Sequence, residues 1–358
     1  MYKFFFVTGP GRCGTNVLAG LIDGHSQIDV FPGEYTNFFG AALQANGLST
    51  TVNLALSGRY LLAAASEEFK DDDDGAEIAA RLEKRFRDIL DRGTTHLPVA
   101  EFLSNICAAA FMKETGIAVV NLCNENIAGL LESFPDCRVI HMLRNPLTQL
   151  NSRYLHRFRD VGSFGGTFPG YWEFGEAFRR NYDSFRQAVA FKNHERVLLV
   201  RLEDLQRHTR AAMERVFAFL GRAMEPSNLS PSRRGREFPG SHRGDRIVTK
   251  DMFAYEDDWS CLSPNDLYYC GRIREARQFY DIPVFPFAKN SYPFFLWRQL
   301  GFVGRHRRKS IHPYRVFKVV VVSIAQYLQD RAIKTYFDRY LKQTSDGWTE
   351  AHPKSLSP

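Results

Sequence analysis

Residues 4–18 read FFFVTGPGRCGTNVL, and this stretch decides the fold. An apolar run with strand character, Phe4–Thr8, leads directly into a glycine-rich loop that opens at Gly9 and closes at Gly14. Glycines let the backbone curl so that several N–H groups point at one anion, and the N-terminus of a following helix adds its positive end. The stretch therefore predicts a phosphate-binding strand–loop–helix unit, although a glycine-rich loop alone is also consistent with a simple turn.

The loop differs from the version that binds nucleoside triphosphates, which needs Gly-Lys-Ser/Thr. Here Gly14 is followed by Thr15 and Asn16, so no lysine can reach a β- or γ-phosphate. The hydroxyl that would hold Mg²⁺ is displaced as well. The positive charge of the loop lies earlier, at Arg12.

Three further apolar runs have strand character: Ile117–Leu122, Val139–Leu143 and Val197–Val200. Helical spacing lies between and after them, at residues 76–91 as an exposed charged helix and at residues 213–220, closed by a glycine. Strands that alternate with helices, each continuously apolar, predict an α/β fold with a parallel central sheet covered by helices on both faces. Ligands of such sheets bind outside the carboxyl ends of the strands.

Composition excludes several other classes. The chain has 44% hydrophobic and 24% charged residues, which is ordinary globular usage rather than that of a disordered or fibrous chain. No stretch approaches the ~20 apolar residues of a membrane span. The six cysteines are scattered without zinc spacing, and the first apolar run is interrupted too early for a signal peptide. We expect reduced thiols in a cytoplasmic protein, and no metal.

The net charge of +7 is concentrated near the C-terminus. Residues 289–318 contain eight lysines and arginines and no acid. The predicted division is therefore a domain over 1–288 and a basic, aromatic-rich helical extension over 289–358, with an amphipathic helix near 324–341. The basic segment is either a solvated tail or a site for phosphate or an anionic membrane surface. Nucleic acid is not expected, because the charge is not interleaved with aromatics along a strand face.

Taken in order along the chain, these motifs resemble the P-loop-fold family of sulfotransferases, which use 3′-phosphoadenosine-5′-phosphosulfate (PAPS). The family loop G-x-x-R-x-G-T-T-x-L matches residues 9–18 except at Asn16. A strand ending in R-D/N-P, with a serine eight residues after the arginine, matches Arg144, Asn145 and Ser152. Further matches are the segments 198–205, 217–221 and 262–267, so the resemblance covers roughly residues 4–285.

The resemblance implies two anion sites. Arg144 and Ser152 would hold the 3′-phosphate of PAPS, and the loop would hold its 5′-phosphosulfate. A guanidinium and a hydroxyl suit such a phosphate, through a charge-assisted pair and a hydrogen bond. The loop residues expected at the 5′-phosphosulfate are Gly9, Gly11, Arg12, Cys13, Gly14, Thr15 and Asn16.

Sulfuryl transfer needs positioning, electrostatic stabilisation and a base for the acceptor's proton. The predicted catalytic residues are Arg12 and the base Glu34, whose pKa nearby phosphates would raise; the alternative for Glu34 is a helix cap or an ion pair. His25 and His141 are interpreted as structural, the second as a buried, hydrogen-bonded histidine. Cys13 is interpreted as a small packing residue.

Two departures from the family affect this site. Glu125 stands where many relatives have a lysine after the second strand. A third basic contact to the nucleotide is usual, and Arg233, Arg234 and Arg243 all fit it loosely.

The leading hypothesis is a PAPS-dependent sulfotransferase acting on a hydroxyl, or secondarily an amine, of a glycan, lipid or small-molecule acceptor. The protein would be cytoplasmic or peripheral at a membrane. The alternatives are a catalytically divergent nucleotide-binding protein, favoured by Glu125, and a P-loop kinase with a degenerate loop.

Overall fold

The computed structural model describes residues 2–34, 51–53, 75–110, 116–122, 126–153, 171–233, 235–237, 262 and 264–283. The chain divides into two compact units. The first comprises Met1–Asn145 and Arg180–Asp257, and the second Pro146–Arg179 and Asp258–Pro358. The predicted extension 289–358, with its helix near 324–341, lies outside the described residues.

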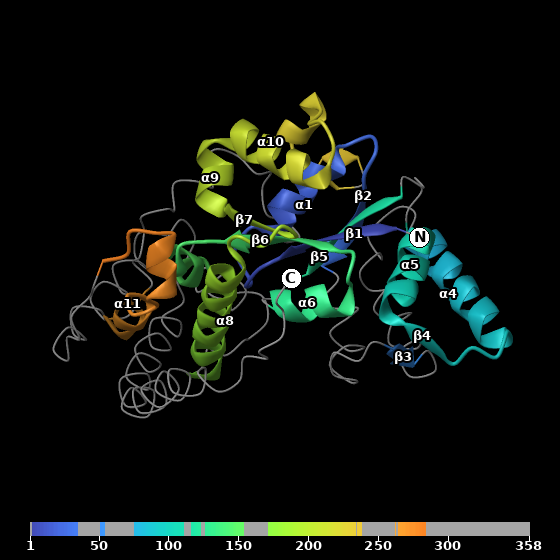
Figure 1. Ribbon diagram of the computed structural model, residues 1–358, viewed down its shortest axis with the longest axis horizontal. Coiled ribbons are helices and arrows are strands. Elements are labelled where there is room, and N and C mark those ends of the chain that lie inside the picture. Colours follow the sequence, from blue (N-terminus) through green and yellow to red (C-terminus); the bar gives the residue numbers. More distant parts are fainter. Residues whose placement is uncertain are drawn as a thin grey trace, which may run out of the picture. The chain divides into compact units, whose positions relative to one another are not determined.

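The first unit is built on a parallel five-stranded sheet in the order β2-β5-β1-β6-β7 (Figure 1). The strand that precedes the glycine-rich loop is therefore central. The four predicted strands are confirmed, while β2 was not predicted. The strands are β1 (Lys3–Thr8), β2 (Asp29–Glu34), β5 (Ile117–Leu122), β6 (Arg138–Leu143) and β7 (Val197–Arg201).

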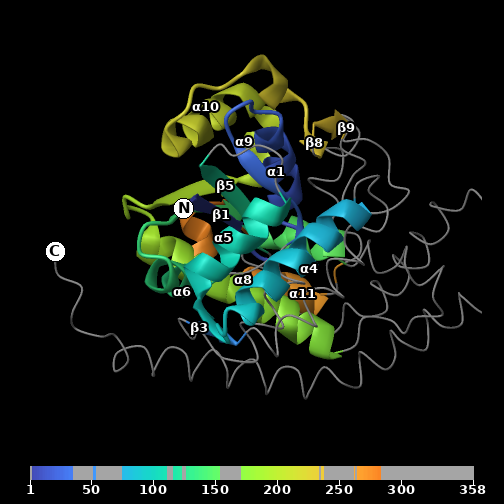
Figure 2. The same ribbon diagram turned by 90° about the vertical axis from the view of Figure 1, so that its right-hand side faces the viewer.

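Helices cover both faces of the sheet, as expected (Figures 1 and 2). Alternate residues of β1 divide between the two faces because successive side chains of a strand point to opposite sides. Phe5 and Val7 pack with α1 (Thr15–Asp23), α9 (Leu202–Arg207) and α10 (Thr209–Leu220). Phe4 and Phe6 pack with α4 (Gly75–Asp91), α5 (Val99–Ala110) and α6 (Ile127–Ser133).

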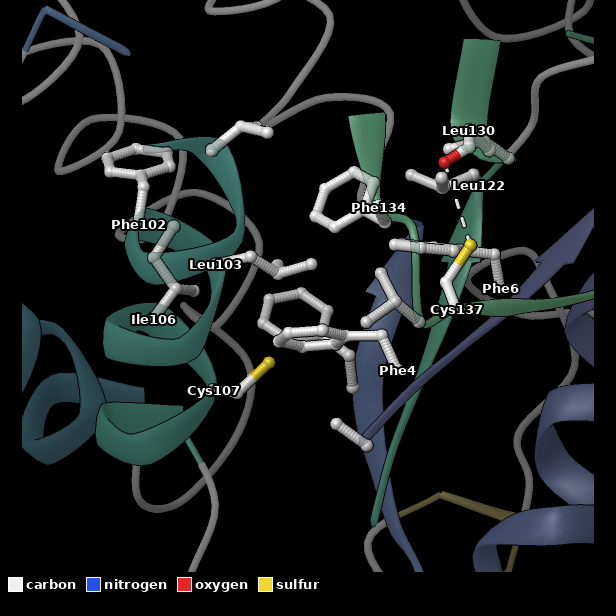
Figure 3. Close-up of a cluster of buried hydrophobic side chains, with 14 of the residues drawn as sticks. Phe4, Phe6, Phe102, Leu103, Ile106, Cys107, Leu122, Leu130, Phe134 and Cys137 are labelled. Atoms are coloured by element: carbon white, nitrogen blue, oxygen red, sulfur yellow. Dashed lines mark hydrogen bonds between the residues drawn. The ribbon is translucent and has the colours of Figure 1, made fainter. Parts of the chain in front are cut away.

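The second of these cores is rich in aromatic residues (Figure 3). Phe6 and Phe134 lie with ring centroids 4.8 Å apart, and Phe102 of α5 is fully buried in the same cluster. Burying a side chain of this size contributes on the order of 2 kcal/mol. Strand β1, which carries the loop, thus packs against helices on both faces of the sheet.

The predicted helix over 76–91 is confirmed as α4, and three apolar residues define its packing side. Ile78, Leu82 and Phe86 recur at helical spacing and are buried, while most of the charged residues face solvent. The predicted closure of α10 by Gly221 is also confirmed. Gly221 has φ 72°, and the N–H of Arg222 donates to the carbonyl of Phe217 at 3.0 Å.

The remaining elements are short. In the first unit, β3 (Thr51–Asn53) pairs antiparallel with β4 (His96–Pro98), and β8 (Ser232–Arg233) pairs with β9 (Arg236–Glu237). Helix α8 (Tyr171–Phe191) crosses from the second unit into the first, and α11 (Pro264–Cys270) belongs to the second. No helix within the described ranges is long and apolar enough to cross a membrane.

Candidate anion-binding site at the carboxyl edge of the sheet

The glycine-rich loop joins β1 to α1 and adopts an unusual backbone. Gly9, Arg12 and Gly14 have φ values of 149°, 71° and 92°. The N–H of Cys13 donates to the carbonyl of Pro10 at 3.3 Å, which closes a turn inside the loop. A left-handed residue other than glycine costs of order 1–2 kcal/mol and persists where the surroundings impose it, often at a functional site. Such alternation of backbone conformations gathers N–H groups into an anion-binding concavity.

Glycine is required at both ends of this loop by space as well as by conformation. A Cβ on Gly9 would lie 2.7 Å from the carbonyl oxygen of Met142 and 2.5 Å from the sulfur of Cys13. A Cβ on Gly14 would lie 2.5 Å from Leu202. Cys13 itself is fully buried, which agrees with its interpretation as a packing residue.

Arg144, from the end of β6, contacts this loop directly. Its Nη1 donates to the carbonyl of Arg12 at 2.9 Å, so the arginines of the two predicted anion motifs lie together. The next residue is fixed by α9, because the N–H of Asn145 donates to Glu203 Oε1 at 2.9 Å. In the sequence, Glu203 stands out only as part of a matching segment. Its carboxylate fixes the backbone directly after Arg144.

Asn16, in the first turn of α1, is held by a residue that no sequence motif marks. The Nδ2 of Asn121, near the end of β5, donates to Asn16 Oδ1. Asn121 is 1% exposed. The available signal was a polar residue interrupting the otherwise apolar strand IAVVNL.

Glu34 is the last residue of β2, at the carboxyl edge of the sheet. Its register partner on β5 is Asn121. On the other side of β5, the register partner of Asn121 is Val7 of β1. Since neighbouring strands lie about 4.8 Å apart, the backbone of Glu34 is two strands, or about 10 Å, from the end of β1. Between Val30 and Glu34 the register shifts.

Ser152 lies in the second unit. It belongs to a helical stretch, residues 146–153, and is half-buried. Its spacing from Arg144 along the chain is the basis on which it remains a predicted 3′-phosphate residue.

His141, in the middle of β6, is confirmed as a buried, hydrogen-bonded histidine. Its Nδ1 lies 2.8 Å from Thr8 Oγ1 and its Nε2 lies 2.8 Å from Ser184 Oγ of α8. Burial lowers the pKa of His141 to about 4, against a smaller opposing effect of the bond to Ser184. The neutral ring thus ties the last residue of β1, directly before Gly9, to helix α8.

His25, at the end of α1, is structural as predicted. Its Nε2 donates to the carbonyl of Ala223 at 2.9 Å, its Nδ1 accepts from the N–H of Gln27, and its ring stacks on Phe217. Next to His25, Ser26 donates to the carboxylate of Glu225 through both its N–H and its hydroxyl.

The candidates for a third basic contact are only partly described. Arg233 and Gly235 flank the β8–β9 turn, where the N–H of Gly235 donates to Asp23 Oδ2 at 2.8 Å (Figure 2). Asp23 ends α1, about 12 Å along the helix axis from Thr15 at its start. Arg234, Arg243 and Glu125 lie outside the described residues.

In the part of the chain that the structure covers, no group of acids, cysteines and histidines could hold a metal ion.

Comparison with known proteins agrees with the fold. The model of the sulfotransferase family matches residues 5–226. The sulfotransferase domain of the Synechococcus PCC 7002 olefin synthase is 18% identical, with a TM-score of 0.50, and the alignment covers 79% of this chain and 96% of that domain. The sulfotransferase domain of the curacin biosynthetic pathway is 17% identical, with a TM-score of 0.52, and the alignment covers 79% and 99%. No curated protein matched.

Proposed function

Because the chain belongs to the sulfotransferase family, we propose that it transfers the sulfuryl group of PAPS to a hydroxyl, or secondarily an amine, of a glycan, lipid or small-molecule acceptor. When bound, PAPS supplies an activated sulfuryl group on a phosphate leaving group. The protein's own contribution is then to bind both ends of the nucleotide, to orient the acceptor and to accept its proton.

The observation that carries this proposal is the contact of Arg144 with the carbonyl of Arg12. It brings Arg144, the first residue of the second predicted anion motif, to the glycine-rich loop at one edge of the sheet. A nucleotide with phosphates on both its 3′ and 5′ positions needs two such cradles, whereas an ATP-dependent kinase needs the first alone. The left-handed loop suits the 5′ group, because alternating backbone conformations of this kind gather N–H groups into a concavity that can bind an anion.

In this proposal Arg12 and the loop N–H groups stabilise the charge that develops on the leaving phosphate. Arg144 and Ser152 bind the 3′-phosphate through a guanidinium pair and a hydroxyl. Glu34 accepts the proton of the attacking hydroxyl. Its backbone position on β2 is two strands from the loop, with β5 between them, and the acceptor is proposed to bind over β5.

A cytoplasmic site of action is part of the same proposal. Of the six cysteines, the four that the structure describes are free and buried: Cys13, Cys107, Cys137 and Cys270. Burial raises the pKa of Cys137 to about 12 and that of Cys107 well above its ordinary value. Such thiols stay protonated and unreactive, and cysteines that form no disulfide are usual in a reducing compartment.

Two measurements test the proposal. Calorimetry should show 3′,5′-bisphosphoadenosine binding at least tenfold more tightly than 5′-AMP, a gap of about 1.4 kcal/mol. Transfer of label from PAPS to members of an acceptor panel should be lost in Arg12→Ala and kept in Arg87→Ala, because Arg87 is exposed on α4 and paired with Glu83. A smaller affinity ratio would contradict the two-cradle arrangement. Binding of ATP in preference to the bisphosphate would favour the kinase alternative.

A further inference from the structure

Asn121 is the one polar residue of strand β5, whose other residues are apolar. The strand is buried throughout, and Ile117 and Val119 pack into the core on the α1 side of the sheet. Because a strand repeats every two residues, the side chain of Asn121 points to that same side. A buried amide without hydrogen bonds is costly, of order 1–3 kcal/mol. Its bond to Asn16 offsets this cost at Nδ2 alone, because the buried Oδ1 of Asn121 has no hydrogen-bond partner among the described residues.

The direction of this bond decides what Asn16 presents to its surroundings. An asparagine amide has an acceptor end, Oδ1, and a donor end, Nδ2. Asn121 donates its Nδ2 to Asn16 Oδ1, so the acceptor end of Asn16 faces β5 and its donor end faces away from it. The reverse orientation would turn the carbonyl oxygen of Asn16, rather than its N–H₂ group, toward an anion held in the loop.

We propose that Asn121 is a positioning residue for the sulfuryl donor: it orients the amide of Asn16 so that Nδ2 donates a hydrogen bond to the 5′-phosphosulfate. This inference rests on the proposed function. It also explains how asparagine can stand at position 16, where the loop of the sulfotransferase family has threonine. A threonine hydroxyl rotates to donate by itself, whereas an asparagine needs a partner that fixes which end points at the anion.

Asn121 also lies between the loop and the predicted base. It pairs in register with Val7 of β1 on one side and with Glu34 of β2 on the other. A substitution of Asn121 can therefore lower nucleotide affinity in two ways: through Asn16, or by destabilising this edge of the sheet. The experiment must separate these two effects.

A double-mutant cycle makes that separation. The probe is 3′,5′-bisphosphoadenosine, with affinity measured by calorimetry and folding checked by thermal melting. Asn121→Ala should weaken binding about tenfold when residue 16 is asparagine, since a hydrogen bond to a charged group is lost. In the Asn16→Thr background the same change should weaken binding less than about twofold.

Two further variants sharpen the result. Asn121→Thr keeps a hydroxyl donor for Asn16 Oδ1 and should stay within about threefold of the original affinity. Asn121→Asp replaces the donor by acceptors, which attract the Nδ2 of Asn16, and should bind more weakly than Asn121→Ala. If Asn121→Ala does not fold, the comparison of Thr with Asp at this position, in both backgrounds, decides the question.

The matched control is Asn228→Ala. Asn228 is another fully buried asparagine of the same unit, but it bonds to the carbonyl of Leu21 and the N–H of Glu225. Its loss should lower the melting temperature with less than about a twofold change in affinity. Equal losses for Asn121→Ala in both backgrounds would overturn the inference. Failure of the unmodified protein to prefer the bisphosphate over 5′-AMP would instead overturn the proposed function.

Discussion

Individual residues of the loop are held by contacts as much as by their own preferences. Arg12 has a left-handed backbone while its carbonyl accepts from Arg144, and Cys13 packs against Gly9. The loop shape is thus imposed from β6 as well as from within. If the loop binds the nucleotide as proposed, it loses little conformational freedom on binding, because its shape is already fixed.

Gly9 should tolerate no side chain. Gly9→Ala introduces a Cβ against the Met142 carbonyl and the Cys13 sulfur, and we expect a loss of about 1–3 kcal/mol beyond the conformational cost. Gly221→Ala is the control, because Gly221 also has positive φ but nothing lies within 4 Å of the added Cβ. It should cost about 1 kcal/mol. Urea denaturation measures both, and similar losses would show that the loop relaxes around the methyl group.

Glu34 tests the chemistry rather than the fold. Glu34→Gln keeps the shape of the side chain but cannot accept a proton, so kcat should fall by roughly 10²–10⁴ while nucleotide affinity stays nearly unchanged. Glu77→Gln, on the solvent-exposed side of α4, is the control and should leave kcat unaltered. Retention of more than about a tenth of the rate would assign the base to another residue.

In the proposed function Arg144 binds the 3′-phosphate and also holds the loop, and one substitution separates these two roles. Because Arg144→Ala removes the proposed partner of the 3′-phosphate, the preference for 3′,5′-bisphosphoadenosine over 5′-AMP should shrink by about tenfold or more, ~1.4 kcal/mol. The lost bond to the Arg12 carbonyl should weaken 5′-AMP as well, by a smaller factor. Calorimetry with both nucleotides, and Arg87→Ala as control, gives the two effects. A uniform loss for both would remove Arg144 from the 3′ site.

At the scale of elements, continuous apolar runs were enough to predict β1, β5, β6 and β7. The edge strand β2 was not predicted, because Pro32 and Gly33 interrupt its pattern and proline is tolerated in a sheet mainly at an edge. The loop could be predicted because its residues are contiguous. The bond between Asn16 and Asn121 could not, since it joins residues 105 positions apart and depends on the strand register.

His141 connects three elements through its two ring nitrogens, and this arrangement should give the protein a measurable pH dependence. Its pKa is about 4 in the folded protein and near 6.5 in an unfolded chain. The unfolded state therefore binds more protons between these values, and the free energy of unfolding falls as pH drops from about 6.5 toward 4, by roughly 3 kcal/mol.

The test replaces the ring by a group that does not titrate. His141→Gln should flatten the dependence of the free energy of unfolding on pH between about 6.5 and 4.5, whatever it costs at neutral pH. Chemical denaturation of both proteins at several pH values measures the two slopes. Parallel slopes would mean that His141 is solvated and titrates normally.

At the scale of the whole molecule, the basic segment 289–318 remains a prediction, since it lies outside the described residues. Each basic residue near an anionic surface contributes about 1 kcal/mol at most, and this attraction weakens with salt. The intact protein should co-sediment with anionic vesicles at low salt and release at high salt. Truncation after Pro286 should abolish this without removing nucleotide binding.

The alternative for this segment gives opposite results. If its aromatic residues pack onto the rest of the protein, truncation should lower the melting temperature markedly and the intact chain should not bind vesicles. Thermal melts of both forms, beside the sedimentation, distinguish the two cases.

The central place of β1 has a consequence for how the chain is made. Phe5 pairs with Val119 on one side and Arg138 on the other, so β1 leaves the ribosome before both of the strands that it pairs with. Until then an apolar, aromatic strand has both edges open, which is a template for aggregation. Fragments that end between β1 and β5 should need a chaperone to stay dispersed, and slowing translation of the segment between these two strands should lengthen that need.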